Sequence, residues 1–171
     1  MDRCSGEVVR PCRTTANRCE HEGVKRQVQF VRSVDLPYGQ IRCRLRDGAQ
    51  ALLGKPDADG AVATLAAHFG DVEISRDMKV RIIDFIEANE ASTGCTLLLT
   101  GDASEHPDLF PHLEARLDAV SVGDDRTVVF FAANYTPPLG VVGNAVDAVL
   151  LHKFAEDSLE ALFSGAIGRL G

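Results

Sequence analysis

Over most of the chain, apolar and polar residues alternate, which is the pattern of β-strands with one buried face. The first alternating run covers residues 28–36 and is ended by Pro37. Further runs of strand type follow at residues 62–69, 72–75, 79–88, 96–100, 114–122 and 127–135. Turn-forming residues separate most of these runs, and residues 123–126 suit a hairpin link. The pattern therefore predicts an antiparallel sheet built largely as a meander.

Two parts of the chain follow a helical period instead. In residues 38–53 the apolar positions recur at spacings of three and four: Ile41, Leu45, Ala49 and Leu52. This predicts an amphipathic helical segment, broken near Gly48. Residues 54–60 contain a proline and two aspartates and are predicted to form a loop.

From residue 139 to residue 170 the apolar residues recur at helical spacing, which predicts one long C-terminal helix. Its wide apolar stripe should lie across the sheet, with Glu156, Asp157 and Glu160 on the solvated face. The elements together predict a single α+β domain, with a curved sheet against this helix and short helices after the first strand.

The strand predicted at residues 79–88 has apolar residues at odd and even positions. Strict alternation places Val80, Ile82 and Asp84 on one face, and Arg81, Ile83 and Phe85 on the other. The pattern therefore predicts a strand that packs on both sides.

Residues 1–23 show neither period and are predicted to form a flexible extension, with the folded domain at residues 24–171. A related hypothesis is that the natural protein starts near Val24, because the organised pattern begins just after it.

The net charge of -7 is unevenly spread. Residues 1–27 carry six basic and four acidic side chains, and the remainder carries 12 basic and 21 acidic ones. Such an acidic domain would repel a phosphate backbone, so nucleic acid is not expected as a partner. No apolar run approaches the roughly 20 residues of a membrane helix, and the start lacks the apolar block of a secretory signal. We therefore expect no membrane insertion and a cytoplasmic location.

Five cysteines are present, three of them within the first nineteen residues. Cys12, Cys19 and His21 do not have the two-to-four-residue spacing of paired zinc ligands, so no metal site is predicted. We expect reduced thiols, with Cys43 and Cys95 acting as small buried hydrophobic residues.

Three polar residues are candidates for interior chemistry: His68, Asp84 and Tyr135. A histidine titrates near neutral pH, and burial would raise the pKa of a carboxyl until it could exchange a proton. For all three we favour a structural interpretation, such as a hydrogen bond to a neighbouring group. His112, by contrast, is expected at the surface. The sequence contains no serine-nucleophile elbow, phosphate-binding loop or dinucleotide motif, so neither a catalytic motif nor a cofactor is predicted.

The segment from His106 to Phe163 carries the most specific pattern of the chain. Its features are a Leu-Phe-Pro turn, a Tyr-x-Pro-Pro-Leu-Gly-x-x-Gly corner and a final helix with an Asp, a His and an Ala-Glu step: Leu109 to Pro111, Tyr135 to Gly143, Asp147, His152, Ala155 and Glu156. This pattern resembles an actinobacterial-type branch of the START-like, or SRPBCC, superfamily, which includes pollen allergens, lipid-transfer domains and polyketide cyclases. The resemblance covers about a third of the chain closely. It implies the helix-grip fold, with a deep cavity between the sheet and the last helix.

The first functional hypothesis is that the protein binds a small hydrophobic molecule, such as a lipid, fatty acyl or polyketide-like compound, in this cavity. Side chains expected to line it are Ile82, Leu97, Leu99, Phe131, Val146 and Leu150. One alternative is an enzyme of the polyketide cyclase or dehydratase type, in which His68, Asp84 or Tyr135 moves protons. Another is a ligand-free interaction module with a filled core. The ligand's identity and the oligomeric state stay open.

Overall fold

The computed structural model describes residues 26–69, 72–87, 93–103, 112–135 and 145–171. Its strands are β1 (Arg26–Val34), β2 (Lys55–Asp57), β3 (Gly60–Phe69), β4 (Val72–Glu87), β5 (Gly94–Ala103), β6 (Leu113–Ser121) and β7 (Thr127–Tyr135). Its helices are α1 (Tyr38–Asp47), α2 (Ala49–Leu53) and α3 (Ala145–Leu170).

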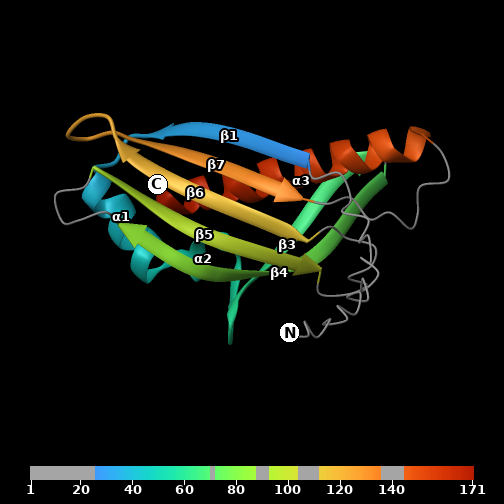
Figure 1. The fold of residues 1–171 in the computed structure, drawn as a ribbon, viewed down its shortest axis with the longest axis horizontal. Coiled ribbons are helices and arrows are strands. Elements are labelled where there is room, and N and C mark those ends of the chain that lie inside the picture. The colour runs from blue at the N-terminus through green and yellow to red at the C-terminus, as the bar shows by residue number, and fades with distance from the viewer. Residues whose placement is uncertain (1–25, 70–71, 88–92, 104–111, 136–144) are drawn as a thin grey trace, which may run out of the picture.

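The strands form one antiparallel sheet in the order β1-β7-β6-β5-β4-β3-β2. It is a meander from β2 to β7, and β1 closes it by pairing with β7. Figure 1 shows that the sheet is curved, that α3 runs across one face, and that α1 and α2 lie toward one end. We call the face covered by the helices the inner face and the opposite one the outer face. The predicted α+β arrangement is confirmed.

Alternation along the central strands divides their side chains cleanly between the two faces. In β6 and β7 the buried residues occur at every second position: Leu113, Ala115, Leu117, Ala119, Thr127, Val129, Phe131, Ala133 and Tyr135. The residues between them are exposed or half-buried and lie on the outer face. The predicted hairpin is also present, because the Val122 N–H donates to the Arg126 carbonyl at 3.0 Å.

Helices α1 and α2 replace the predicted single segment, with the break at Gly48 as expected. All four apolar positions of the predicted stripe are buried, including Ile41 and Leu45. Cys43 is exposed, so its expected burial was wrong. It lies two residues from both Ile41 and Leu45 and therefore faces away from the buried stripe.

Helix α3 is held in place by elements from the first half of the chain. It packs on β1, β3 and α2, and Arg32 of β1 forms an ion pair with Glu160 at 3.0 Å. Near its end, Arg169 donates to the carbonyl oxygen of Leu52 at 2.7 Å. Glu160 is exposed as predicted, whereas Asp157 and Glu156 are half-buried. The predicted turns of this helix before Ala145 lie outside the described residues.

Two elements differ in kind from the prediction. The predicted loop 54–60 contains strand β2. Pro56 is tolerated in this strand because β2 lies on the sheet edge, where a missing N–H costs no ladder hydrogen bond. The runs predicted at residues 72–75 and 79–88 belong to a single strand, β4. The polar residues between them pair with β3, so they continue the strand instead of ending it.

A β-bulge in β4 changes which side chains share a face. Ile82 pairs with Leu99 and Asp84 with Leu98, which leaves Ile83 as the extra residue. The extra residue reverses the alternation, so Phe85 packs with the core while Asp84 is exposed on the outer face. The predicted faces of Asp84 and Phe85 were therefore wrong.

Candidate functional site

Three rows of cross-strand neighbours cross the inner face. The first, called here the aromatic row, contains Phe30, Phe131, Leu117, Leu97 and Phe85. The next, the alanine row, contains Val28, Ala133, Ala115, Leu99 and Ile82. The third, the tyrosine row, contains Arg26, Tyr135, Leu113, Gly101, Val80 and Ala61. Apart from Arg26 and Tyr135 these positions are apolar, so this face can bury apolar surface but offers few polar groups.

Helix α3 meets the sheet at the aromatic row. The Phe163 ring stacks on Phe131 with centroids 5.6 Å apart and on Phe30 at 6.1 Å. Phe30 and Phe131 also stack, at 6.2 Å. This three-ring cluster fills the space between helix and sheet at that level.

Four of the six residues predicted to line a cavity lie on the inner face. Leu97, Leu99 and Phe131 are buried, and Ile82 is half-buried against them. Val146 and Leu150 belong to α3, but their side chains lie outside the described part of the chain. The predicted orientation is thus right for the four, while their contact with a ligand stays a prediction.

Of the two candidates for proton chemistry whose side chains the structure describes, Tyr135 lies on the inner face and Asp84 does not. Tyr135 is 3% exposed, and burial raises the pKa of its phenol above the ordinary value. Asp84 lies on the outer face, where its Oδ1 accepts a hydrogen bond from the Phe85 N–H at 2.8 Å. His68 pairs with Glu73 through the backbone, and its side chain is outside the described residues. The structure therefore does not bring Asp84 and Tyr135 together.

A polar cluster lies where α1 covers the inner face. Arg42 forms an ion pair with Glu87 at 2.9 Å, while its Nε and the Tyr38 hydroxyl are buried without a well-formed hydrogen bond. Burial and the nearby Cys95 thiol raise the pKa of Tyr38, and burial raises the pKa of Cys95. Both groups are therefore held in their neutral forms, and Cys95 is a weak nucleophile.

A chain of polar groups links three strands on the outer face. His112 Nδ1 lies 2.7 Å from Asp102 Oδ1, His112 Nε2 lies 3.4 Å from Thr100 Oγ1, and Arg81 donates to Asp102 Oδ2 at 2.6 Å. The order hydroxyl, imidazole, carboxylate resembles a nucleophilic triad. However, the Thr100 hydroxyl is buried and donates to the Leu113 carbonyl at 3.1 Å. We assign this chain to joining β4, β5 and β6. His112 is exposed, as predicted.

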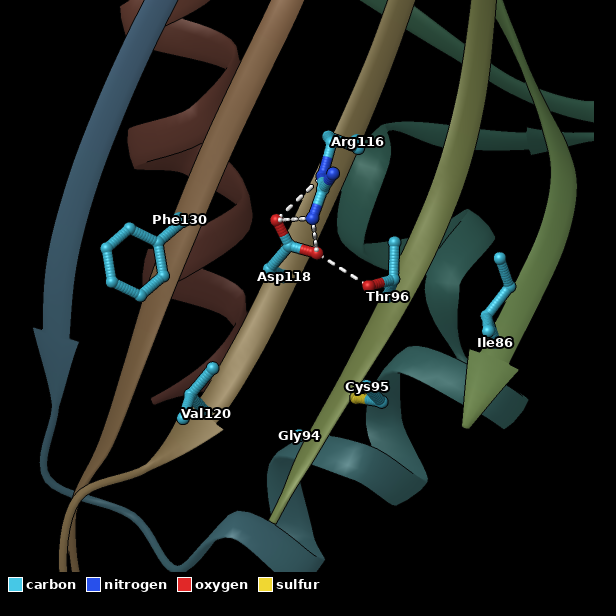
Figure 2. Close-up of a pocket in the computed structure, with 8 residues that line it drawn as sticks. All are labelled: Ile86, Gly94, Cys95, Thr96, Arg116, Asp118, Val120 and Phe130. Carbon is cyan, nitrogen blue, oxygen red and sulfur yellow. Dashed lines mark hydrogen bonds and ion pairs between the residues drawn. The ribbon is translucent and has the colours of Figure 1, made fainter. Parts of the chain in front are cut away.

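The outer face also carries a groove of about 390 Å³. Figure 2 shows Phe130 and Val120 on one side, Ile86 on the other, and the polar group of Arg116, Asp118 and Thr96 between them. Asp118 accepts hydrogen bonds from Thr96 Oγ1 at 2.5 Å and from Arg116 Nε at 2.8 Å. Its carboxylate is thus occupied by partners within the chain.

Within the described ranges, no group of three or more His, Cys, Asp or Glu side chains is arranged to hold a metal ion. None of the described helices is both long and apolar enough to cross a membrane.

Comparison with known proteins identifies the architecture. No protein-family model and no curated protein matches the chain. Among solved structures, norcoclaurine synthase from Thalictrum flavum superposes with a TM-score of 0.51 at 15% identity, over 97% of this chain and 98% of that chain. Ara h 8.0201 gives a TM-score of 0.51 at 9% identity, over 85% and 97%.

The chain has the START-like helix-grip fold. The fold predicted from the motif in residues 106–163 is therefore confirmed. At these identities the likeness to solved structures concerns the fold alone, so the chemistry of this helix-grip domain has to be argued from its own residues.

The sequence reasoning missed the outer face. Phe130 and Phe131 are consecutive, and since neighbouring strand residues point to opposite faces, one of these rings had to face outward. The side chains around Phe130 come from different strands, so which of them are neighbours could not be predicted without the strand register.

Proposed function

We propose that this protein binds a small hydrophobic molecule between the inner face of its sheet and helix α3. The observation that carries the proposal is the alanine row, where Ala133 and Ala115 pair side by side at the centre of the inner face. One row away, the stack of Phe131 on Phe163 separates sheet and helix by the thickness of two large side chains. Small side chains next to such a spacer favour an unfilled volume, which an apolar ligand would occupy.

The side chains of the inner face support a ligand that is mostly apolar. Of the two hydroxyl-bearing inner residues on β7, Thr127 donates to the Leu36 carbonyl at 2.9 Å and is committed to the fold. Tyr135 lies one inner position beyond Ala133 and is kept neutral by burial. A ligand with an apolar body and one polar or charged end group fits this lining. A charged group of the ligand would have to stay at the margin of the inner face, where Arg26 pairs with Tyr135 and Glu87 lies on β4, because the aromatic and alanine rows contain no charged side chain.

The fold likeness agrees with this proposal but does not carry it. Norcoclaurine synthase is an enzyme by its name, which leaves a catalytic alternative of the cyclase or dehydratase type to consider. That alternative requires two proton-transfer groups converging on one point of the cavity. Asp84 faces outward, so the alternative rests on Tyr135 and on His68, and we do not advance it.

The experiment is native mass spectrometry of the purified protein, followed by extraction of the denatured protein and analysis of what is released. The proposal expects an apolar compound to accompany the folded protein, or the empty protein to take up a long-chain fatty acid or a polyketide-like compound. An empty protein that takes up no member of a panel of such compounds would reject the proposal.

A further inference from the structure

The large apolar side chains that the fold leaves in solvent gather on one side of the molecule. Those more than a third exposed in the described part of the chain are Val31, Ile83, Ile86, Val120, Val122 and Phe130. Val31, Ile86, Val120 and Phe130 lie on the outer face, Ile83 is the extra residue of the β4 bulge, and Val122 lies in the hairpin loop. Isolated exposed apolar residues are ordinary, but a group confined to one face indicates an interaction surface.

Strand pairing brings three of these six residues into one row. Val31, Phe130, Asp118, Thr96 and Ile86 form one continuous row of cross-strand neighbours from β1 to β4. Phe130 is 43% exposed and Ile86 is 47% exposed, and they flank the groove of about 390 Å³ seen in Figure 2. We call this row, together with Val120 and Arg116, the outer patch.

The centre of the outer patch is polar but neutral. Arg116 and Asp118 form an ion pair at 2.7 Å, and the Arg116 side chain is 57% exposed. The carboxylate is shared with Thr96, so the centre offers no unpaired charge to a strongly basic or acidic partner.

A second copy of the chain satisfies these conditions. Arg116 and Asp118 are two residues apart on β6 and both face outward. If two outer faces stack with their β6 strands antiparallel, a twofold axis at the level of residue 117 places Arg116 of each copy opposite Asp118 of the other. The ion pairs of the two copies then form one cluster of four alternating charges, and the apolar walls lose water on both copies. We propose that the outer patch is the interface of a homodimer of this kind.

The size of the outer patch predicts a weak association. Five strands at about 4.8 Å spacing and three rows of residues cover roughly 20 Å by 15 Å of each copy. This is well below the roughly 800 Å² per partner of a standard interface, so we expect a Kd in the micromolar range.

The test is sedimentation analysis of the full chain across a range of concentrations, with a reducing agent present because of the five cysteines. Wild type should show a reversible monomer–dimer equilibrium. Arg116→Asp and Asp118→Arg should each be monomeric at concentrations where wild type is half dimeric, because each variant places like charges opposite one another. Phe130→Ser should also weaken association, by about tenfold or more.

The decisive sample is an equimolar mixture of Arg116→Asp and Asp118→Arg. In this arrangement two acidic positions of one copy face two basic positions of the other, so mixing should restore a one-to-one dimer. Circular dichroism and thermal melting of each variant confirm that it is folded before it is used. A wild type that stays monomeric at every concentration would overturn the proposal, and so would a dimer that survives both single substitutions. Ligand uptake is a separate readout, so failure here leaves the proposed function standing.

Discussion

The ring of Phe131 on β7 lies 5.6 Å, centroid to centroid, from the ring of Phe163 on α3, and the two planes differ by 23°. This stack joins the sheet to the long helix in the middle of the molecule. It also forms one wall of the space in which we propose that a ligand binds. The stability of the fold and the shape of the proposed cavity therefore depend on the same pair of residues.

The loss of stability when a phenylalanine of β7 is truncated should depend on which face of the sheet its ring occupies. Phe131→Ala removes a side chain that is 2% exposed, and we expect the free energy of unfolding to fall by about 3–5 kcal/mol. The neighbouring Phe130 is 43% exposed, so Phe130→Ala should cost less than about 1.5 kcal/mol. Urea denaturation at low protein concentration measures both changes without a contribution from association. Equal losses would contradict the assignment of these rings to opposite faces.

The two tyrosines of the folded chain should ionise at higher pH than tyrosines of the unfolded chain. Burial raises the pKa of both Tyr38 and Tyr135 in the folded protein. The phenols of the unfolded chain ionise first, near pH 10, so the unfolded state releases protons that the folded state keeps. The stability they contribute is present below that pH and is lost as pH rises toward the folded-state pKa.

Ultraviolet absorbance of the tyrosinate ion checks this prediction. The native protein should ionise at higher pH than the same chain in concentrated denaturant, and Tyr135→Phe should remove one of the two delayed phenols. A native titration that overlays the denatured one would show that neither phenol is buried as described.

A second pH effect should come from the outer-face pair of His112 and Asp102. The hydrogen bond from His112 lowers the pKa of Asp102, with a further contribution from the charge of Arg81. A lowered folded-state pKa stabilises the fold above the ordinary Asp value of about 4, and this stabilisation is lost as pH falls through the folded-state value.

Asp102→Asn should therefore lower the free energy of unfolding near neutral pH. The change should be under about 1 kcal/mol, because the Asp102 side chain is 40% exposed. The difference from wild type should shrink as pH falls below about 4. Asp124→Asn, in the exposed hairpin loop, is the control and should show a smaller difference at every pH. A difference for Asp102→Asn that does not change with pH would contradict the ionic origin of the effect.

The sequence was sufficient to predict most elements of this fold, because their periods are clear. Leu113, Ala115 and Leu117 alternate strictly with polar residues, and Ile41 and Leu45 mark one face of α1. The exceptions are β2, which was predicted to be a loop, and β4, where one inserted residue, Ile83, reverses the alternation that follows it. A bulge changes hydrogen-bond pairing and not composition, so the outward position of Asp84 could not be read from the residue pattern.

The site was less predictable than the fold. Leu97, Leu99 and Phe131 were placed on the correct face, although Leu98 and Phe130 are apolar as well, so the residue pattern left the choice of face open by one register. The contacts between Arg116, Asp118 and Thr96, or between His112 and Asp102, depend on the register of neighbouring strands. One sequence does not contain that register, so these groups became visible only in the structure.

The central claim is that an apolar ligand occupies the space beside the alanine row, and Ala133→Leu tests it most directly. The matched control is Ala132→Leu, which adds the same atoms to the adjacent residue of β7 on the outer face. The measurement is the uptake of 1-anilinonaphthalene-8-sulfonate, and its displacement by a long-chain fatty acid, in variants whose melting curves show that they are folded. The account predicts that Ala133→Leu weakens displaceable dye binding by at least about tenfold, because the added side chain fills the proposed space, while Ala132→Leu leaves it unchanged. Unchanged binding in Ala133→Leu, or a loss in Ala132→Leu alone, would place the ligand elsewhere and contradict the account.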